Sequence, residues 1–488
     1  MIWLPILVPV LAAALYAVFG WRRASTWLAP ASAAGVLAVA IVLAVAVAQD
    51  GPRTAWLLRL DALSSFMLVV IGAVGLLATV ATPAYLRAEI AAGRAGTRTA
   101  GRHCLLVQLF LATMALAVLA ADLGVLWVAI EATTIVTAFL VGQRRTRASV
   151  EAAWKYVVIC STGIALALLG VIVLNHAARH ATGGPVGLDL VDLSAAAPGL
   201  DPGVTRIAVA LLIIGLGAKA GLAPLHAWLP DAHSQAPAPV SALMSGVLLS
   251  VAAYAILRVK VIADAALGAG FARTVLVVMA LASLVLAATL LLGQRDYKRM
   301  LAYSSIEHLG LVALASAIGS QFAVAAALLH VLGHGLAKGA LFVGAGRILQ
   351  VTGTSAVAGV RGLASAHPAL AGGVGLGVLA LVGLPPFSLF ASELGIFRAG
   401  FGEGLGWVTA AAVVLVVVIA GALFVHSGRM MLGDPPDGPG AARAAVRLPV
   451  PTAVAVFGGL AACAVLGVTA GPLGSLIGQA AEVVAGAR

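Results

Sequence analysis

The sequence predicts an all-α polytopic membrane protein with about fourteen transmembrane helices. Hydrophobic residues make up 62% of its 488 residues, charged residues make up 10%, and the mean hydropathy is +1.09. Soluble domains carry about 25% charged residues, so the composition excludes a globular domain with a single anchor. The second observation is a series of apolar runs, each long enough to cross a hydrocarbon core about 30 Å thick.

These runs predict the order of the spans. They centre on residues 2–19, 26–48, 60–82, 104–120, 123–141, 152–174, 207–225, 240–262, 274–292, 300–318, 322–348, 369–390, 405–430 and 452–477. We expect four parts, which are an N-terminal three-span segment (1–102), two groups of five spans (103–262 and 263–430), and a cytoplasmic linker with the last span (431–488).

Charges in the connecting segments predict the orientation. Segments after odd-numbered spans hold 17 Lys and Arg residues, whereas segments after even-numbered spans hold 8. Because short cytoplasmic loops carry the excess of positive charge, the first set should face the cytoplasm. We therefore expect a multi-pass protein of the cytoplasmic membrane with both termini outside. The net charge of +11 lies in such short loops without interleaved aromatic residues, so it does not indicate nucleic-acid binding.

A lysine deep in the seventh span is the most informative residue. Lys219 lies thirteen residues after Arg206, roughly 20 Å along a helix that rises about 1.5 Å per residue. An ammonium at that depth is costly and is functional by default. Pro224 follows closely and breaks the helix, because proline removes a backbone donor and clashes with the preceding turn. A lysine paired only for structure is the alternative.

The twelfth span contains a matching break. Its sequence Gly383-Leu-Pro-Pro-Phe387 places Pro385 and Pro386 inside an apolar run. Broken helices at corresponding positions of two groups of spans are typical of inverted repeats with ion sites at their interface. We therefore expect two inverted five-helix repeats.

Further ionisable residues lie inside the expected spans. Glu131 stands among apolar neighbours in the fifth span, and Lys219 is the obvious partner for it. A purely structural ion pair is the alternative. Because an intramembrane pair is expensive to keep for stability alone, the pattern favours a functional one.

The tenth and eleventh spans carry the densest polar group. Glu307 and His308 are adjacent, and His330, His334 and Lys338 follow at intervals of four residues. That spacing places the last three on one helical face, about 6 Å apart along the axis. Imidazoles titrate near physiological pH and suit a relay of protons. A single buried histidine is often only a satisfied core residue, but three groups on one face favour a pathway.

Glu393 follows the second break and is the acidic end of the series. We expect no metal site, because the His-x-x-x-His pair lacks the adjacent glutamate of the HExxH motif. Cys104, Cys160 and Cys463 are too far apart to indicate a metal or disulfide framework. No Rossmann glycines, P-loop or cysteine cluster is present, so the sequence predicts no cofactor and no catalytic centre of its own.

Three segments resemble one family. They are the run from Lys219 to Pro237 (KAGLAPLHAWLPDAHSQAP), the run from Lys298 to Ser305 (KRMLAYSS), and the His330-x-x-x-His334-x-x-x-Lys338 pattern. All three are similar to segments of the antiporter-like subunits of respiratory complex I and of Mrp sodium/proton antiporters. Two further segments, residues 127–133 (WVAIEAT) and 306–308 (IEH), look most like the corresponding subunit of the hydrogenase-4 and formate hydrogenlyase type.

The resemblance implies two inverted five-helix repeats, a central row of ionisable residues, and docking in a larger redox complex that moves protons or sodium ions. It matches Glu131 and Lys219 to the family's fifth-span and seventh-span charges, and Glu393 to its twelfth-span terminal charge. The sequence departs from complex I relatives at Ser250, where they usually place a lysine.

The sequence therefore predicts a proton- or sodium-translocating, non-redox membrane subunit of a respiratory or hydrogenase-like complex. Its partners would be other membrane subunits, a peripheral electron-transfer arm reached through them, and the lipid bilayer. Two alternatives stay open. One is an Mrp-type cation/proton antiporter subunit, and the other is a passive membrane anchor whose polar row is only packing.

Overall fold

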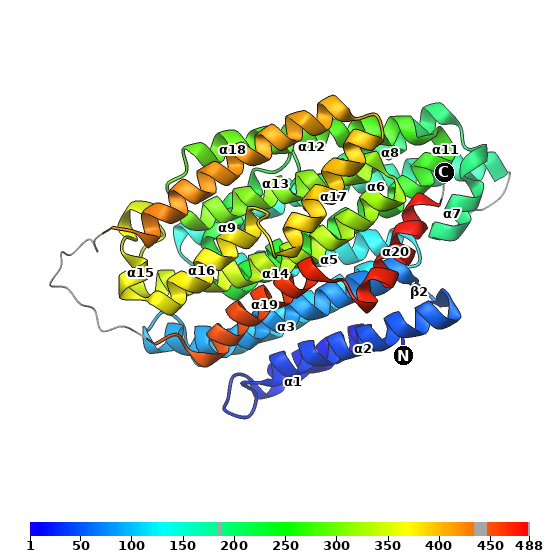
Figure 1. Ribbon diagram of the computed structural model, residues 1–488. Helices are drawn as coiled ribbons and strands as arrows, with labels where there is room; N and C mark the ends of the chain where they lie inside the picture. The colour runs from blue at the N-terminus through cyan, green and yellow to red at the C-terminus, as the bar shows by residue number, and fades with distance from the viewer. Residues whose placement is uncertain (183–186, 434–446, 487–488) are drawn as a thin grey trace.

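The structure is a computed structural model that describes residues 1–182, 187–433 and 447–486 (Figure 1). Within these residues, twelve helices are long and apolar enough to cross a membrane. Two shorter apolar helices, Leu4–Phe19 and Pro368–Leu381, lie where the first and twelfth spans are expected. The expected all-α membrane fold is confirmed, with one small addition. A hairpin of β1 (Arg53–Ala55) and β2 (Leu58–Leu60) joins the second and third spans.

The helices run in chain order as follows. The first half contains α1 (Leu4–Phe19), α2 (Leu28–Asp50), α3 (Ala62–Ala91), α4 (Thr97–Leu119), α5 (Leu123–Val141), η1 (Gly142–Arg144), α6 (Arg147–Thr182), α7 (Leu190–Ala196), η2 (Ala197–Gly199), α8 (Pro202–Ala220), α9 (Trp228–Gln235), α10 (Ala238–Leu243), η3 (Met244–Leu248) and α11 (Leu249–Leu267). The second half contains α12 (Ala269–Leu292), α13 (Tyr297–Ile318), α14 (Gln321–Thr352), η4 (Val357–Gly359), α15 (Leu363–Ala366), α16 (Pro368–Leu381), α17 (Ser388–Gly402), α18 (Gly406–Met431), α19 (Val450–Val468) and α20 (Pro472–Ala485).

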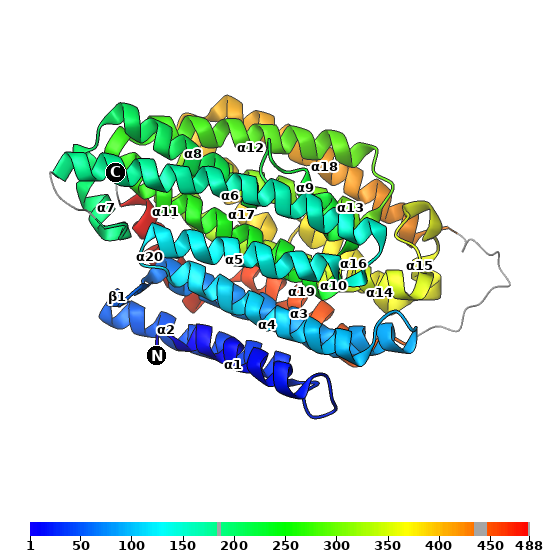
Figure 2. The same ribbon diagram turned by 180° about the vertical axis from the view of Figure 1, so that it is seen from behind.

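The helices lie roughly side by side, with α14 in the middle of the bundle and α1 and α2 on one flank (Figures 1 and 2). The segment α10–α11 and helix α13 are buried along their whole apolar length. Small residues let the central backbones approach closely. A Cβ atom added at Gly335 of α14 would lie 2.8 Å from the carbonyl oxygen of Gly246 in η3. Glycine at both positions therefore holds α14 against the eighth span.

Both expected helix breaks are present. Helix α8 ends at Ala220, Gly221 adopts a left-handed φ of 75°, and α9 begins only at Trp228. Helix α16 ends at Leu381, and Gly383 has a φ of 65°. Pro224, Pro385 and Pro386 lie in the irregular segments that follow, as predicted, with cis peptide bonds at Ala223–Pro224 and Pro385–Pro386.

The eighth span contains a feature that the sequence did not predict. It is continuous from Ala238 to Leu267, but Met244–Leu248 forms a π-helical turn. Such turns leave backbone groups less tightly paired and occur often at functional sites. This one lies where Ser245 Oγ meets Ser305 Oγ of α13 at 2.8 Å.

The end of the last span differs from expectation, and one connection contains a helix that was not expected. The last span ends at Val468, and α20 is a separate helix that begins at Pro472 because Gly471 interrupts the chain with a φ of 50°. The connection between the sixth and seventh spans is partly helical, since it contains α7. The expected linker at residues 434–440 lies outside the described residues.

Candidate functional site: a row of buried ionisable residues

The seventh-span lysine is buried and hydrogen-bonded to hydroxyl groups. Lys219 lies in the last turn of α8 and is 0% exposed. Its Nζ donates to Thr134 Oγ1 of α5 at 2.8 Å and to Tyr156 Oη of α6 at 2.6 Å. The Thr137 hydroxyl donates to the Thr133 carbonyl, so the Tyr156 hydroxyl is the donor in its 2.6 Å contact with Thr137. Tyr156 can thus accept from the ammonium and donate onward at once.

The expected direct pair between Glu131 and Lys219 is not formed. No nitrogen–oxygen contact within 4.0 Å joins them among the described side chains. Instead, the Glu131 carboxylate is half-buried and accepts a hydrogen bond of 2.8 Å from Ser161 on α6. The helical rise explains the difference, because Thr134 lies one turn further along α5 and takes the position facing the ammonium. The two charges therefore interact through space, beside hydroxyls that the sequence reasoning had not singled out.

The histidines of the second half form a connected cluster. His308 Nδ1 of α13 lies 3.0 Å from His330 Nε2 of α14, and His330 Nδ1 lies 2.9 Å from Ser392 Oγ of α17. The ring of His334 lies 4.9 Å from the ring of His308. All three histidines are at most 1% exposed. His330 and His334, which were expected on one face of the eleventh span together with Lys338, have stacked rings with centroids 6.5 Å apart on α14.

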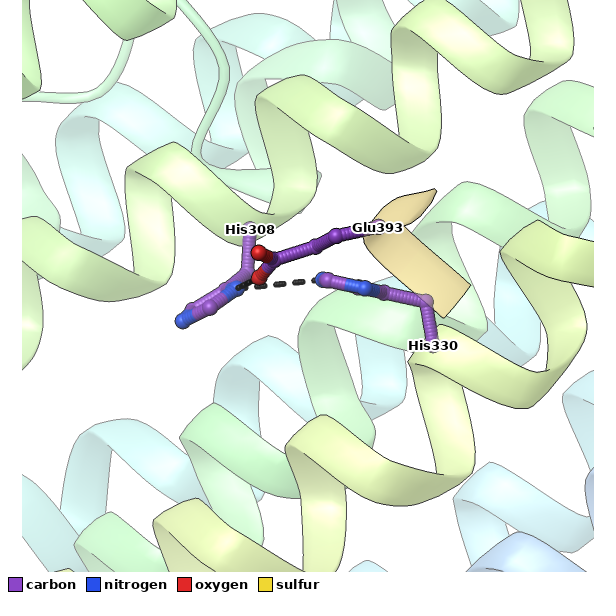
Figure 3. Close-up of side chains that lie close together, drawn as sticks. All are labelled: His308, His330 and Glu393. Atoms are coloured by element: carbon purple, nitrogen blue, oxygen red, sulfur yellow. Dashed lines mark hydrogen bonds and ion pairs between the residues drawn. The ribbon is translucent and has the colours of Figure 1, made fainter. Parts of the chain in front are cut away.

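The charged groups of the second half surround this cluster. The ammonium of Lys338 donates to the Leu301 carbonyl and to the Ser304 hydroxyl. Glu307 is 3% exposed, and its Oε2 atom has no hydrogen-bond partner among the described residues. Glu393 approaches His308 Nδ1 at 4.0 Å (Figure 3). Since an unpaired buried charge is very costly, these groups must share protons, charge partners or water.

The region between the two clusters contains further polar groups. Ser250, at the place where relatives usually carry lysine, is buried and its hydroxyl has no partner among the described atoms. His233 of α9 is buried and stacks on Phe342 of α14 with ring centroids 4.9 Å apart. Lys298 was counted with the loop charges, but it is 1% exposed, and its Nζ donates to the carbonyls of Ser234 and Ala236.

Sequence reasoning therefore singled out most of these buried ionisable residues, but not Lys298, and missed the hydroxyl groups that bind them. The missed residues are Thr134, Tyr156, Ser161, Ser304 and Ser392. A signal existed on α5, where Thr133, Thr134 and Thr137 recur at helical spacing in an apolar span. Tyr156 and Ser392 gave no such signal, because single hydroxyl residues are common in apolar helices.

Comparison with known proteins identifies the fold and the family. The family model described as NADH:quinone oxidoreductase/Mrp antiporter, TM, matches residues 120–419, a stretch that includes both broken helices. The chain belongs to this family. It is an antiporter-like membrane subunit of the type found in complex I and in hydrogenase-type complexes, as the sequence resemblance predicted.

Relatives of this antiporter-like subunit cover most of its length. It is 38% identical over 388 residues to the hydrogenase-4 component F homolog of Methylacidiphilum infernorum, covering 79% of this chain and 81% of that protein. It is 34% identical over 418 residues to NADH-quinone oxidoreductase subunit N of Desulforudis audaxviator, covering 82% and 79%.

Solved structures support the same fold. A chain of the Mrp complex from Dietzia sp. superposes with a TM-score of 0.85 at 23% identity, covering 99% of this chain and 97% of that one. A chain of respiratory complex I from Thermus thermophilus gives 0.80 at 25% identity, covering 100% and 99%. Because these relatives are subunits of multi-subunit membrane complexes, other membrane subunits are the partners of this one.

Proposed function

We propose that this antiporter-like subunit carries protons or sodium ions across the membrane, through the row formed by Glu131, Lys219, Glu307, His308, His330, His334, Lys338 and Glu393. One observation supports the proposal most directly. Lys219 is completely buried, yet its ammonium is met by two hydroxyls, and no carboxylate of the described residues lies within 4.0 Å of it. A lysine kept only for stability would be expected to have a direct counter-ion, because leaving a buried charge uncompensated costs several kcal/mol.

Hydroxyl partners suit a lysine that changes its charge. A hydroxyl can accept from an ammonium and can also donate to a neutral amine, so both forms keep a hydrogen bond. A change in the position of the Glu131 charge, or of a bound ion, would then shift the equilibrium between the charged and the neutral form of Lys219. In the second half, the series of hydrogen bonds from Ser392 through His330 to His308 offers a similar route for protons, since each imidazole can exchange a proton between its two nitrogens.

In this proposal the two groups of five spans, residues 103–262 and 263–430, are the inverted repeats, each with one broken helix. Residues 1–102 and 431–488 flank them. The subunit would have no redox centre and would receive its driving energy from a peripheral electron-transfer arm through neighbouring subunits. The expectation that it needs no cofactor of its own rests on the sequence alone.

The test compares Lys219→Ala with Lys155→Ala in the assembled complex in membrane vesicles. Lys155 is an exposed lysine that pairs with Glu151 and Asp231, so it controls for the loss of a positive charge. We expect Lys219→Ala to abolish ion uptake while electron transfer partly survives, and Lys155→Ala to retain most uptake. Normal uptake by an assembled Lys219→Ala complex would refute the proposal and favour a passive anchor.

We also propose that the subunit lies in the cytoplasmic membrane with both termini outside. The loop charges support this orientation, and β2, α7 and the end of α20 lie toward one end of the bundle, with α15 at the other (Figure 1). A reporter active only outside the cytoplasm should work when fused after residue 488. Activity of a cytoplasm-only reporter at that position would reverse the orientation.

A further inference from the structure

Three side chains from three helices converge at one buried point. His308 comes from α13, His330 from α14 and Glu393 from α17, and one potential ligand atom from each lies within 4.8 Å of the other two (Figure 3). The two imidazole nitrogens are 3.0 Å apart, and a Glu393 oxygen lies 4.0 Å from His308 Nδ1. This set differs from the His330–His334 pair that the sequence had raised and set aside as a metal motif.

Hydrogen bonds orient one of the three groups for metal binding. Ser392 Oγ donates to the Leu389 carbonyl at 3.0 Å, so it must accept from His330 Nδ1–H at 2.9 Å. His330 Nε2 therefore carries a free lone pair, directed at His308. An imidazole held by a hydrogen bond to its other nitrogen is the usual arrangement of a histidine metal ligand.

The carboxylate has room and no competing partner. A Cβ atom added at Gly383 would lie 2.3 Å from Glu393 Oε2, so only glycine at this break leaves space for the carboxylate. Apart from the 4.0 Å approach to His308, no hydrogen bond or ion pair engages Glu393 in the part of the chain that the structure describes. Its charge is thus available to a cation, and its 7% exposure makes it the most accessible of the three.

We propose that His308, His330 and Glu393 form a binding site for a divalent transition metal of the Zn²⁺ class. Two imidazoles and one carboxylate are a known three-ligand set for zinc, with water at the fourth position. Ligands about 2.0–2.1 Å from a tetrahedral metal lie roughly 3.3 Å from one another. The carboxylate oxygen now lies 4.0 Å from His308 Nδ1 and within 4.8 Å of the His330 ligand atom, so it needs to approach the two nitrogens by at most about 1.5 Å. Mg²⁺ and Ca²⁺ prefer all-oxygen sites and fit this set poorly.

Metal binding has a consequence for ion movement, which rests on the proposed function. His308 would bind the metal through the lone pair of Nδ1. The proton that Nδ1 now donates to His330 would then move to Nε2 of His308, which has no hydrogen-bond partner among the described residues. The shared hydrogen bond between His308 and His330 is lost, and Glu393 is fixed on the metal. A metal bound at this site should therefore block ion movement through the second half. Removal of the metal by a chelator should restore it.

The binding test uses Co²⁺ as the probe, because tetrahedral Co²⁺ has strong visible absorption and commonly replaces zinc. The full chain is purified in detergent, treated with EDTA and titrated. The exposed residues His176 and His180 lie one turn apart with rings 4.2 Å from each other, so both are first changed to Asn to remove a surface site. We expect one tetrahedral Co²⁺ per chain, displaced by Zn²⁺.

Variants identify the ligands. Glu393→Gln and His330→Gln should weaken binding at least tenfold, and Ser392→Ala about tenfold through loss of the supporting hydrogen bond. His334→Gln, beside the site but outside the ligand set, should bind normally. If one ligand variant fails to fold, the others decide the result. An octahedral spectrum, or binding unchanged by Glu393→Gln, would overturn the site.

A separate measurement tests the consequence. Zn²⁺ at concentrations that fill the site should inhibit ion uptake by vesicles carrying the assembled complex, and EDTA should restore it. Tetrahedral binding with no ion uptake under any condition would leave the metal site standing and refute the proposed function. Full uptake by the metal-loaded complex would refute the block.

Discussion

Replacing Asp61 with Asn should destabilise the protein through one buried ion pair. Asp61 is the N-cap residue of α3 and is 2% exposed. Its Oδ1 accepts from the Ser64 amide at 2.9 Å and from Arg258 Nη2 of α11 at 2.7 Å, and Arg59 Nε lies 3.7 Å from Oδ2. The pair thus joins the third span to the eighth, close to the membrane boundary.

The size of the destabilisation follows from which interactions of Asp61 the substitution keeps and which it removes. Asn caps a helix about as well as Asp, so the hydrogen bond to the Ser64 amide should survive. The negative charge is lost, which leaves the Arg258 guanidinium buried without its main partner. Breaking a buried pair from one side costs about 3–5 kcal/mol. We therefore expect Asp61→Asn to lower the free energy of unfolding by about 3–5 kcal/mol at neutral pH.

The matched control is Asp122→Asn at the N-cap of α5. Asp122 also caps through its carboxylate, with an acceptor distance of 2.8 Å to the Val125 amide, but it has no ion pair in the described structure. Its replacement should cost less than about 1 kcal/mol, the value of a terminal charge near a helix dipole. Unfolding in mixed detergent micelles titrated with SDS measures both variants.

The pH dependence gives a second check. Burial acts to raise the pKa of Asp61, but the charge and hydrogen bond of Arg258, with the Ser64 amide and Arg59, hold it below its ordinary value of 3.8. A carboxyl group whose pKa is lower in the folded than in the unfolded state contributes its full stabilisation of the fold at pH values above its unfolded pKa. It loses this stabilisation as the pH falls through its folded pKa. The difference between wild type and Asp61→Asn should stay constant from about pH 5 to 8 and shrink only below about pH 4. An equal cost for Asp61→Asn and Asp122→Asn would refute the reasoning.

Two further predictions concern ion movement in vesicles carrying the assembled complex. Tyr156→Phe removes one of two hydrogen bonds to the Lys219 ammonium, worth about 1.5–3 kcal/mol, and should slow ion uptake roughly 10- to 150-fold. The control is Tyr303→Phe, because Tyr303 is buried but makes no hydrogen bond to a charged group among the described residues. Equal effects of the two substitutions on ion uptake would show that Tyr156 is not part of the pathway. His330→Ala or His334→Ala alone should cause a moderate defect because water can replace one imidazole, and the double variant a severe one. Near-normal uptake by a well-assembled double variant would leave the histidine face as packing.

The sequence by itself determined the fold class and singled out the charged members of the proposed row. Apolar runs of spanning length predict helices because an unpaired backbone group in lipid is prohibitively costly. The same cost makes Lys219 and Glu393 conspicuous, since a charge inside an apolar run is visible without any knowledge of its neighbours. The breaks at Pro224 and Pro385 follow from the chemistry of proline, which is equally local.

Only the tertiary structure decided which groups meet. The sequence paired Lys219 with Glu131, but the ammonium lies against Thr134 and Tyr156. A shift of one helix by one turn, or its rotation about its own axis, is enough to replace one partner of a side chain with another. For the same reason His308 of α13 comes to lie beside His330 of α14 and Glu393 of α17, residues on three different helices. Contacts between helices depend on crossing angle, rotation and the close approach that glycines such as Gly335 allow. These quantities are set by the packing of the whole bundle and leave no local mark in the sequence.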